Sequence, residues 1–166
     1  GDGGFEIESS GTTVDANTVG YWKLDEISSA SFSDSSPYNN DSTSVVGTTF
    51  VKEGKVNGAR NFDGEDDKIS VAQNSWPSNS FTIEGWFTTD QTITIVTEST
   101  SGIYGSTGQH YLFYPDYNHM GVSVGTNGIQ VFEHDSSYLP ALAVYEGFVP
   151  SGWNHVAVVY NNKQPS

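Results

Sequence analysis

The chain has 166 residues, a length that suits one domain with a single hydrophobic core. Hydrophobic residues make up 35% and aromatic residues 13%, while small polar residues abound, which is typical of short strands joined by many turns. Twenty Asp and Glu against six Lys and Arg give a formal net charge of −14, which disfavours nucleic acid and anionic membranes as partners. The excess of carboxylates suits either solubility or the binding of divalent cations such as Ca²⁺.

Cysteine is absent, which excludes disulfides, thiol catalysis and thiolate zinc sites. No apolar run approaches the roughly 20 residues of a membrane-spanning helix, so membrane insertion is not expected. No signal segment opens the chain, and if the protein is secreted its signal has been removed.

Residues 1–17 are small and polar and are predicted to form a linker or an edge strand, and residues 18–166 the domain. Strand alternation begins at Thr18 and places Trp22 and Leu24 on one face, which should meet the core. A turn-rich loop follows at residues 33–44. Further strands are predicted at 45–51, 59–62, 68–71, 81–88, 92–97, 109–114, 121–125, 129–133, 142–145 and 153–160.

About a dozen short strands, with no helical period and no internal repeat, predict an all-β sandwich or barrel. The strand at 81–88 has aromatic side chains on both faces, which favours a central strand whose second face lines a groove. One face has Phe81, Ile83, Gly85 and Phe87, and the other has Thr82, Glu84 and Trp86. In the strand at 153–160, His155 shares a face with Ala157 and Val159, and we expect a hydrogen-bonded core histidine.

Five segments, in order along the chain, resemble bacterial laminin G-like domains of the concanavalin A-like superfamily. They are Tyr21-Trp22-Lys23-Leu24-Asp25-Glu26, Asp34-Ser35-Ser36, Gly58-Ala59-Arg60-Asn61-Phe62-Asp63-Gly64 with Asp66-Asp67, Phe81-Thr82-Ile83-Glu84-Gly85-Trp86-Phe87, and Gly152-Trp153-Asn154-His155-Val156-Ala157-Val158-Val159-Tyr160. The resemblance implies an antiparallel jelly-roll β-sandwich and a secreted or cell-surface protein.

After the strand ending at Tyr160, the family continues with a hairpin and a closing strand. By this resemblance residues 161–166 fall inside a loop, and the sandwich lacks its last strands. Unpaired sheet edges are an aggregation hazard, so we expect either a fragment or a second polypeptide that supplies the missing strands.

A structural Ca²⁺ near the edge of the sandwich is common in the resembling family. Carried over, the resemblance makes Asp25, Asp34, Asn39 and Asp63 candidate metal ligands, although Tyr38 and Ser42 stand where the family often has Gly. The densest acidic cluster, residues 63–67, lacks the spacing of an EF-hand loop. The alternative is a solvated turn and a loop held by Asx hydrogen bonds.

Glycoside hydrolases of the same superfamily use two carboxylates on one strand. Glu133 and Asp135 have the two-residue spacing, but Ser137 stands where the hydrolase signature requires a third acid, so no catalytic residues are assigned.

Sugar recognition needs aromatic faces beside polar groups that fix hydroxyls. Candidate ligand-binding residues are Glu84, Trp86, Tyr104, Tyr111, Tyr114, Tyr117, Asn118 and Asn127.

The sequence therefore favours a non-catalytic carbohydrate-binding or adhesion module of a larger secreted or cell-surface protein. Its expected partner is a glycan or an extracellular or cell-surface protein. One alternative is a structural or assembly domain completed by strands from another chain, and a second is a glycoside hydrolase of the same superfamily.

Overall fold

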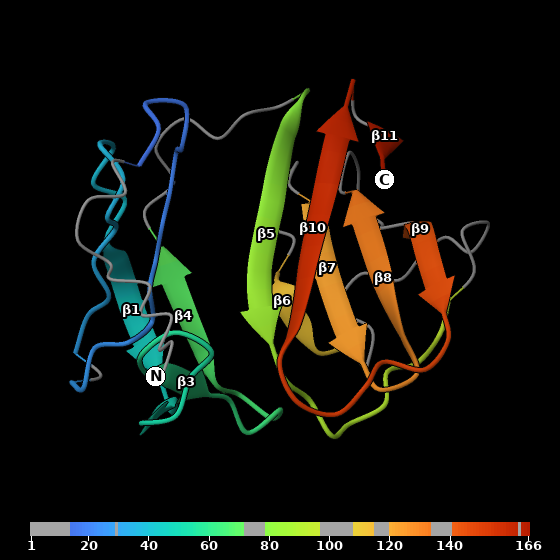
Figure 1. The fold of residues 1–166 in the computed structure, drawn as a ribbon, viewed down its shortest axis with the longest axis horizontal. Helices are drawn as coiled ribbons and strands as arrows, with labels where there is room; N and C mark the ends of the chain where they lie inside the picture. Colours follow the sequence, from blue (N-terminus) through green and yellow to red (C-terminus); the bar gives the residue numbers. More distant parts are fainter. Residues whose placement is uncertain are drawn as a thin grey trace, which may run out of the picture. The chain divides into compact units, whose positions relative to one another are not determined.

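A computed structural model describes residues 14–28, 30–71, 79–96, 108–114, 120–133, 141–162 and 164–166 (Figure 1). Within these ranges every regular element is a β-strand and none is a helix, which confirms the all-β prediction. The chain divides into two compact units, residues 1–76 and 77–166. The prediction of one domain over residues 18–166 stays a prediction.

The first unit contains two antiparallel strand pairs. Strand β1 (Ser42–Val46) pairs with β4 (Lys68–Val71), and β2 (Thr49–Val51) pairs with β3 (Ala59–Asn61). The strand predicted at 45–51 is thus divided in two. Gly47 turns the chain between the parts with a φ of +70°, which suits glycine because it has no Cβ.

The strand predicted to begin at Thr18, with Trp22 and Leu24 on one face, is wrong. Among these residues only Trp22 makes a β-bridge, an isolated one to Asp34. Leu24 has a φ of +58°, a left-handed conformation that ends the alternation expected there. Trp22 is instead held by its indole Nε1, which donates a hydrogen bond of 2.9 Å to the backbone carbonyl of Asn40.

The second unit has two antiparallel sheets. Strands β5 (Phe81–Phe87), β10 (Asn154–Asn161) and β11 (Gln164–Pro165) form one sheet, in the order β11-β10-β5. Strands β6 (Tyr111–Phe113), β7 (Met120–Gly125), β8 (Gly128–Glu133) and β9 (Ala141–Glu146) form the other, in chain order.

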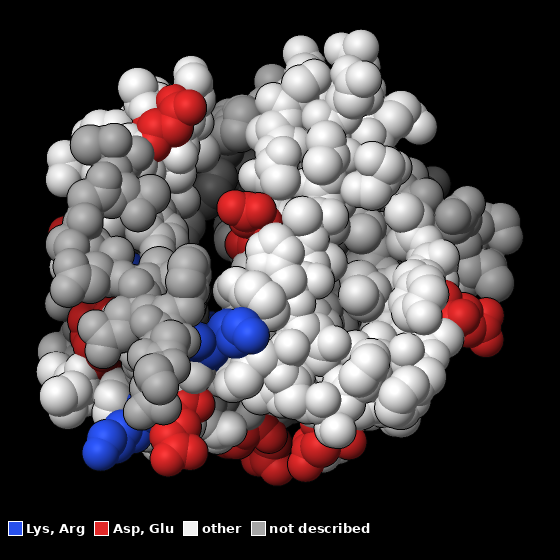
Figure 2. Space-filling model, viewed as in Figure 1, with Lys and Arg blue, Asp and Glu red and all other residues white. Residues whose placement is uncertain are grey.

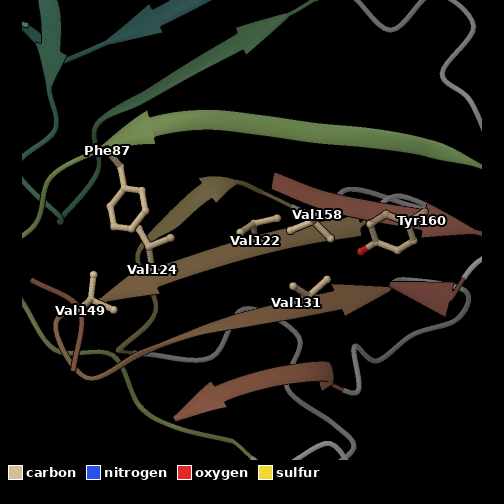
Figure 3. Close-up of a cluster of buried hydrophobic side chains, with 7 residues drawn as sticks. All are labelled: Phe87, Val122, Val124, Val131, Val149, Val158 and Tyr160. Carbon is tan, nitrogen blue, oxygen red and sulfur yellow. The ribbon is translucent and has the colours of Figure 1, made fainter. Parts of the chain in front are cut away.

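One buried cluster joins the two sheets of the second unit, an arrangement consistent with a β-sandwich. Figure 3 shows its side chains, which are Phe87, Val122, Val124, Val131, Val149, Val158 and Tyr160. Phe81 stacks on Tyr160 with ring centroids 4.7 Å apart, so neighbouring strands also meet through their aromatic rings.

Two expectations for the three-stranded sheet are wrong. Among the described strands β10 is central and β5 lies at the edge, although β5 was predicted to be central. Residues 161–166 were expected inside a loop, but β11 pairs with β10 through Pro165 opposite Tyr160. Asn162, with a φ of +49°, lies in the short connection between them.

Residues 91–96 form no strand, although one was predicted at 92–97. The buried side chain of Gln130 on β8 holds them, because it accepts a hydrogen bond from the backbone N–H of Val96 and donates one of 2.8 Å to the carbonyl of Thr94. Val96 in turn packs against the buried ring of Phe132. The segment is thus held largely by side chains, together with single backbone hydrogen bonds such as the one from the N–H of Thr94 to the carbonyl of Gly108.

Candidate functional site on the β5–β10 face

The outward side of the β5–β10 ladder carries the strongest candidate site. Strand alternation sends Ile83, Phe87 and Val158 to the core, so the residues between them face away from it. We call this surface the Trp86 face. It consists of Thr82, Glu84 and Trp86 on β5 and Val159, Ala157 and His155 on β10, which lie opposite them in that order.

His155 contacts both Trp86 and Glu84 on this face. The indole of Trp86 is 45% exposed, and its ring centroid lies 4.9 Å from that of His155 at an angle of 55°. Nε2 of His155 lies 3.7 Å from Oε2 of Glu84, and these side chains are 39% and 65% exposed. The imidazole therefore has both an aromatic ring and a carboxylate as neighbours.

The expectation that His155 is a core histidine is wrong. The core side of β10 contains Val156, Val158 and Tyr160, whereas His155, Ala157 and Val159 face outward. Both sides of the strand carry apolar residues, so the alternation alone did not identify the buried side. Sequence reasoning therefore missed His155 as a site residue, although its place opposite Trp86 follows once β5 and β10 are paired.

The Trp86 face is suited to binding more than to catalysis of hydrolysis. An exposed indole offers an apolar surface to the C–H groups of a sugar ring, and the carboxylate of Glu84 can accept hydrogen bonds from its hydroxyls. Both groups are on a paired strand, so the backbone beneath them is held by the ladder. Glu84 is the one carboxylate of this face, and a retaining glycosidase needs two about 5 Å apart.

Of the other predicted sugar-binding residues, those that the structure describes do not belong to this face. Tyr111 is on β6 in the opposite sheet, where its ring contacts the rings of Phe132 at 6.0 Å and Tyr114 at 5.1 Å. Tyr114 is 57% exposed. Tyr104, Tyr117 and Asn118 lie outside the described residues, as does Asp135, the proposed partner of Glu133.

Asn127 has a structural role. It lies in the turn between β7 and β8. Its side-chain amide accepts one hydrogen bond from the backbone of Ile93 and donates another to it. Oδ1 accepts from the Ile93 N–H at 2.8 Å and Nδ2 donates to the Ile93 carbonyl at 2.9 Å. The amide that was expected to fix a sugar hydroxyl instead fixes the segment at 91–96.

Asp34, a predicted metal ligand, organises the loop around it. Its Oδ1 accepts hydrogen bonds from the backbone N–H groups of Tyr21 and Ser36, and its Oδ2 from the hydroxyl of Ser36 and the N–H of Asn40, all at 2.6 to 2.8 Å. A carboxylate has about four lone-pair sites, so these four donors leave none for a cation. Asp34 is therefore removed from the candidate ligands.

These contacts also set the charge of Asp34. Burial by itself would raise the pKa of this carboxyl, but the hydrogen bonds from Ser36, Tyr21 and Asn40 favour the ionised form and hold the pKa below its usual value. The alternative interpretation, a loop held by Asx-type hydrogen bonds, is the one that the geometry of Asp34 shows, although β1 begins at Ser42, inside the loop predicted at 33–44.

The remaining predicted metal ligands have different surroundings. Oδ2 of Asp25 accepts a hydrogen bond of 3.1 Å from Asn57, and Asn39 has a φ of +54° in the loop. Asp63 instead groups with Asp66 and Asp67, with one carboxylate oxygen from each within 4.8 Å of the others. This exposed cluster offers the oxygen ligands that Ca²⁺ prefers, with water completing the coordination.

Comparison of the chain with protein-family models, with curated proteins and with solved structures found no match. No helix that could cross a membrane occurs in the described ranges.

Proposed function

We propose that the protein is a non-catalytic carbohydrate-binding or adhesion module and that the Trp86 face binds its ligand. The observation that carries this proposal is the exposed indole of Trp86 held against His155 and beside Glu84 on one paired sheet surface. Aromatic rings that present a face to solvent while a neighbouring polar group fixes orientation are the recurring elements of sugar recognition.

We also propose that the fold is a laminin G-like jelly roll and that the protein is secreted or on a cell surface. Two of the five segments that resemble this family, 81–87 and 152–160, supply β5 and β10, which pair in continuous antiparallel register from Phe81 opposite Tyr160 to Phe87 opposite Asn154. The pairing supports the resemblance because it joins segments that are far apart in the sequence.

A binding screen over glycans and extracellular matrix proteins tests the function. We expect the wild-type protein to bind a defined set of glycans and Trp86→Ala to abolish that binding. Phe148→Ala is the matched control, because it removes an aromatic ring that is 76% exposed but lies outside the Trp86 face. Its binding should equal that of the wild type.

Other outcomes would favour the alternatives. Absence of binding to every glycan and matrix protein, or binding that survives Trp86→Ala, would contradict the proposal and favour an assembly domain completed by strands of another chain. Hydrolysis of a β-glucan that is lost in Glu133→Gln would favour a glycoside hydrolase.

A further inference from the structure

We infer that the Trp86 face prefers sugars that carry a protonated amine and discriminates against anionic sugars, an inference that rests on the carbohydrate-binding function proposed above. The starting point is the carboxylate of Glu84, which is 65% exposed and therefore open to a ligand. A carboxylate and an aromatic face are the two groups that best recognise an ammonium, by a charge-assisted hydrogen bond and by a cation–π contact.

The surroundings of Glu84 leave room for such a group. Ala157 lies directly opposite Glu84 on β10, between His155 and Val159 along the strand. Its single methyl group is the smallest side chain of the Trp86 face, so the side chains around it extend further from the sheet. A sugar that stacks on Trp86 can therefore approach the carboxylate over Ala157.

The charge of the second unit points the same way. Between residues 77 and 166 the sequence has one basic residue, Lys163, and seven acidic residues, which are Glu84, Asp90, Glu98, Asp116, Glu133, Asp135 and Glu146. Figure 2 shows acidic side chains in several separate places on the face it displays. A surface of this charge attracts cationic ligands and repels sulfated or uronic-acid sugars, most strongly at low ionic strength.

His155 is the one group of the Trp86 face that can become cationic, and it lies next to Glu84. An anionic sugar that approaches the imidazole also comes near the carboxylate of Glu84, which repels it.

Direct titration of three matched oligosaccharides tests this preference. The probes are glucosamine oligomers, their N-acetylated counterparts and uronic-acid oligomers of the same length, in a mildly acidic buffer that keeps the amine protonated. We expect the amine-bearing oligomer to bind more tightly than the N-acetylated one, and the uronic-acid oligomer to bind weakest. Relative to the N-acetylated oligomer, Glu84→Gln should weaken binding of the amine-bearing oligomer about 3- to 5-fold, as for one exposed ion pair.

A second variant tests access over Ala157 without altering charge. Ala157→Leu fills the space opposite Glu84 and should weaken binding of all three oligomers, while Thr92→Leu, at an exposed position outside the Trp86 face, should not. If the preference for the amine-bearing oligomer is undiminished in Glu84→Gln, that preference comes from the overall charge of the unit, and the inference is overturned. Tighter binding of the uronic-acid oligomer through Trp86 would also overturn the inference but leave the carbohydrate-binding function standing. If no oligomer and no glycan binds, the proposed function itself is wrong, and the inference with it.

Discussion

Ser36 holds the carboxylate of Asp34 with both of its donors: its backbone N–H lies 2.8 Å from Oδ1 and its hydroxyl 2.6 Å from Oδ2. The residue is two positions after Asp34, so the contact is local and typical of an Asx turn. The two other donors, the N–H groups of Tyr21 and Asn40, come from residues 13 positions before and 6 positions after it. One buried carboxylate therefore ties three parts of the first unit together.

Asp34→Ala should destabilise the first unit by about 3 kcal/mol, because it leaves buried N–H groups without an acceptor. Chemical denaturation monitored by tryptophan fluorescence measures the effect. Glu53→Gln is the matched control, since it removes one exposed carboxylate of the same unit and should change the free energy of unfolding by less than about 0.5 kcal/mol. Equal stabilities of the two variants would contradict the role of Asp34.

The same carboxylate predicts a dependence of stability on pH. The pKa of Asp34 is lower in the folded protein than in the unfolded chain, so the unfolded chain takes up its proton first as the pH falls. Its stabilising effect is full well above the unfolded pKa of 3.8 and is lost as the pH falls through the folded pKa.

The free energy of unfolding of wild type and Asp34→Asn, measured from pH 7 to pH 2, checks this sign. The difference between the two proteins should be constant above about pH 5 and should shrink below about pH 4. A difference that grows as the pH falls would show that the pKa of Asp34 is raised and not lowered.

The acidic cluster gives a prediction for calcium. If Asp63, Asp66 and Asp67 bind Ca²⁺ in the folded state alone, saturating Ca²⁺ at about 100 times Kd adds about 2.7 kcal/mol of stability and raises the Tm. Asp66→Asn should abolish this rise and leave intact the hydrogen bonds from the N–H of Asp63 to Asp67 and from the N–H of Glu65 to Asp63. NaCl at matched ionic strength is the control, and a Tm that is the same in Ca²⁺ and in EDTA would exclude the site.

Gln130 gives a prediction about the second unit. Gln130→Leu keeps the size of a fully buried side chain but leaves the N–H of Val96 without an acceptor and removes one of the two side-chain donors to the carbonyl of Thr94, so we expect a loss of about 2 kcal/mol. Gln91→Leu, at an exposed position, is the control. Hydrogen exchange checks the mechanism, because the Val96 amide should lose its protection in Gln130→Leu before the core strands do.

Strands with a clear alternation of apolar and polar residues, which also pair with another strand, were predictable from the sequence. The strand at 68–71 has the predicted bounds, and β5 buries Phe81, Ile83 and Phe87 on the side expected of them. The segment at 92–97 alternates just as well, yet the side chain of Gln130, 34 and 36 residues away, takes the place of a partner strand. The pattern of residues within the segment itself does not reveal a contact with a side chain so far away in the sequence.

The candidate site was partly predictable. Glu84 and Trp86 were identified because two-residue alternation puts them on one side of a strand. His155 was assigned to the core because Ala157 and Val159 on its side of β10 are apolar, and only the core contacts of Val158 and Tyr160 distinguish the two sides. For Asp34 the residue type was compatible with a metal ligand, but its four backbone and hydroxyl donors could not be read from spacing.

Trp86 and Phe87 are adjacent aromatic residues on opposite sides of β5. Substitutions of the two therefore distinguish an effect on ligand binding from an effect on stability. Phe87 is 6% exposed and belongs to the core, so Phe87→Ala should cost about 3–5 kcal/mol. Trp86 is 45% exposed, and Trp86→Ala should cost less than about 1 kcal/mol while glycan binding is lost. Denaturation and binding measured on the same preparations check the pair. If Trp86→Ala loses as much stability as Phe87→Ala, the indole of Trp86 serves packing. Its loss of binding would then not be evidence for a site on this face.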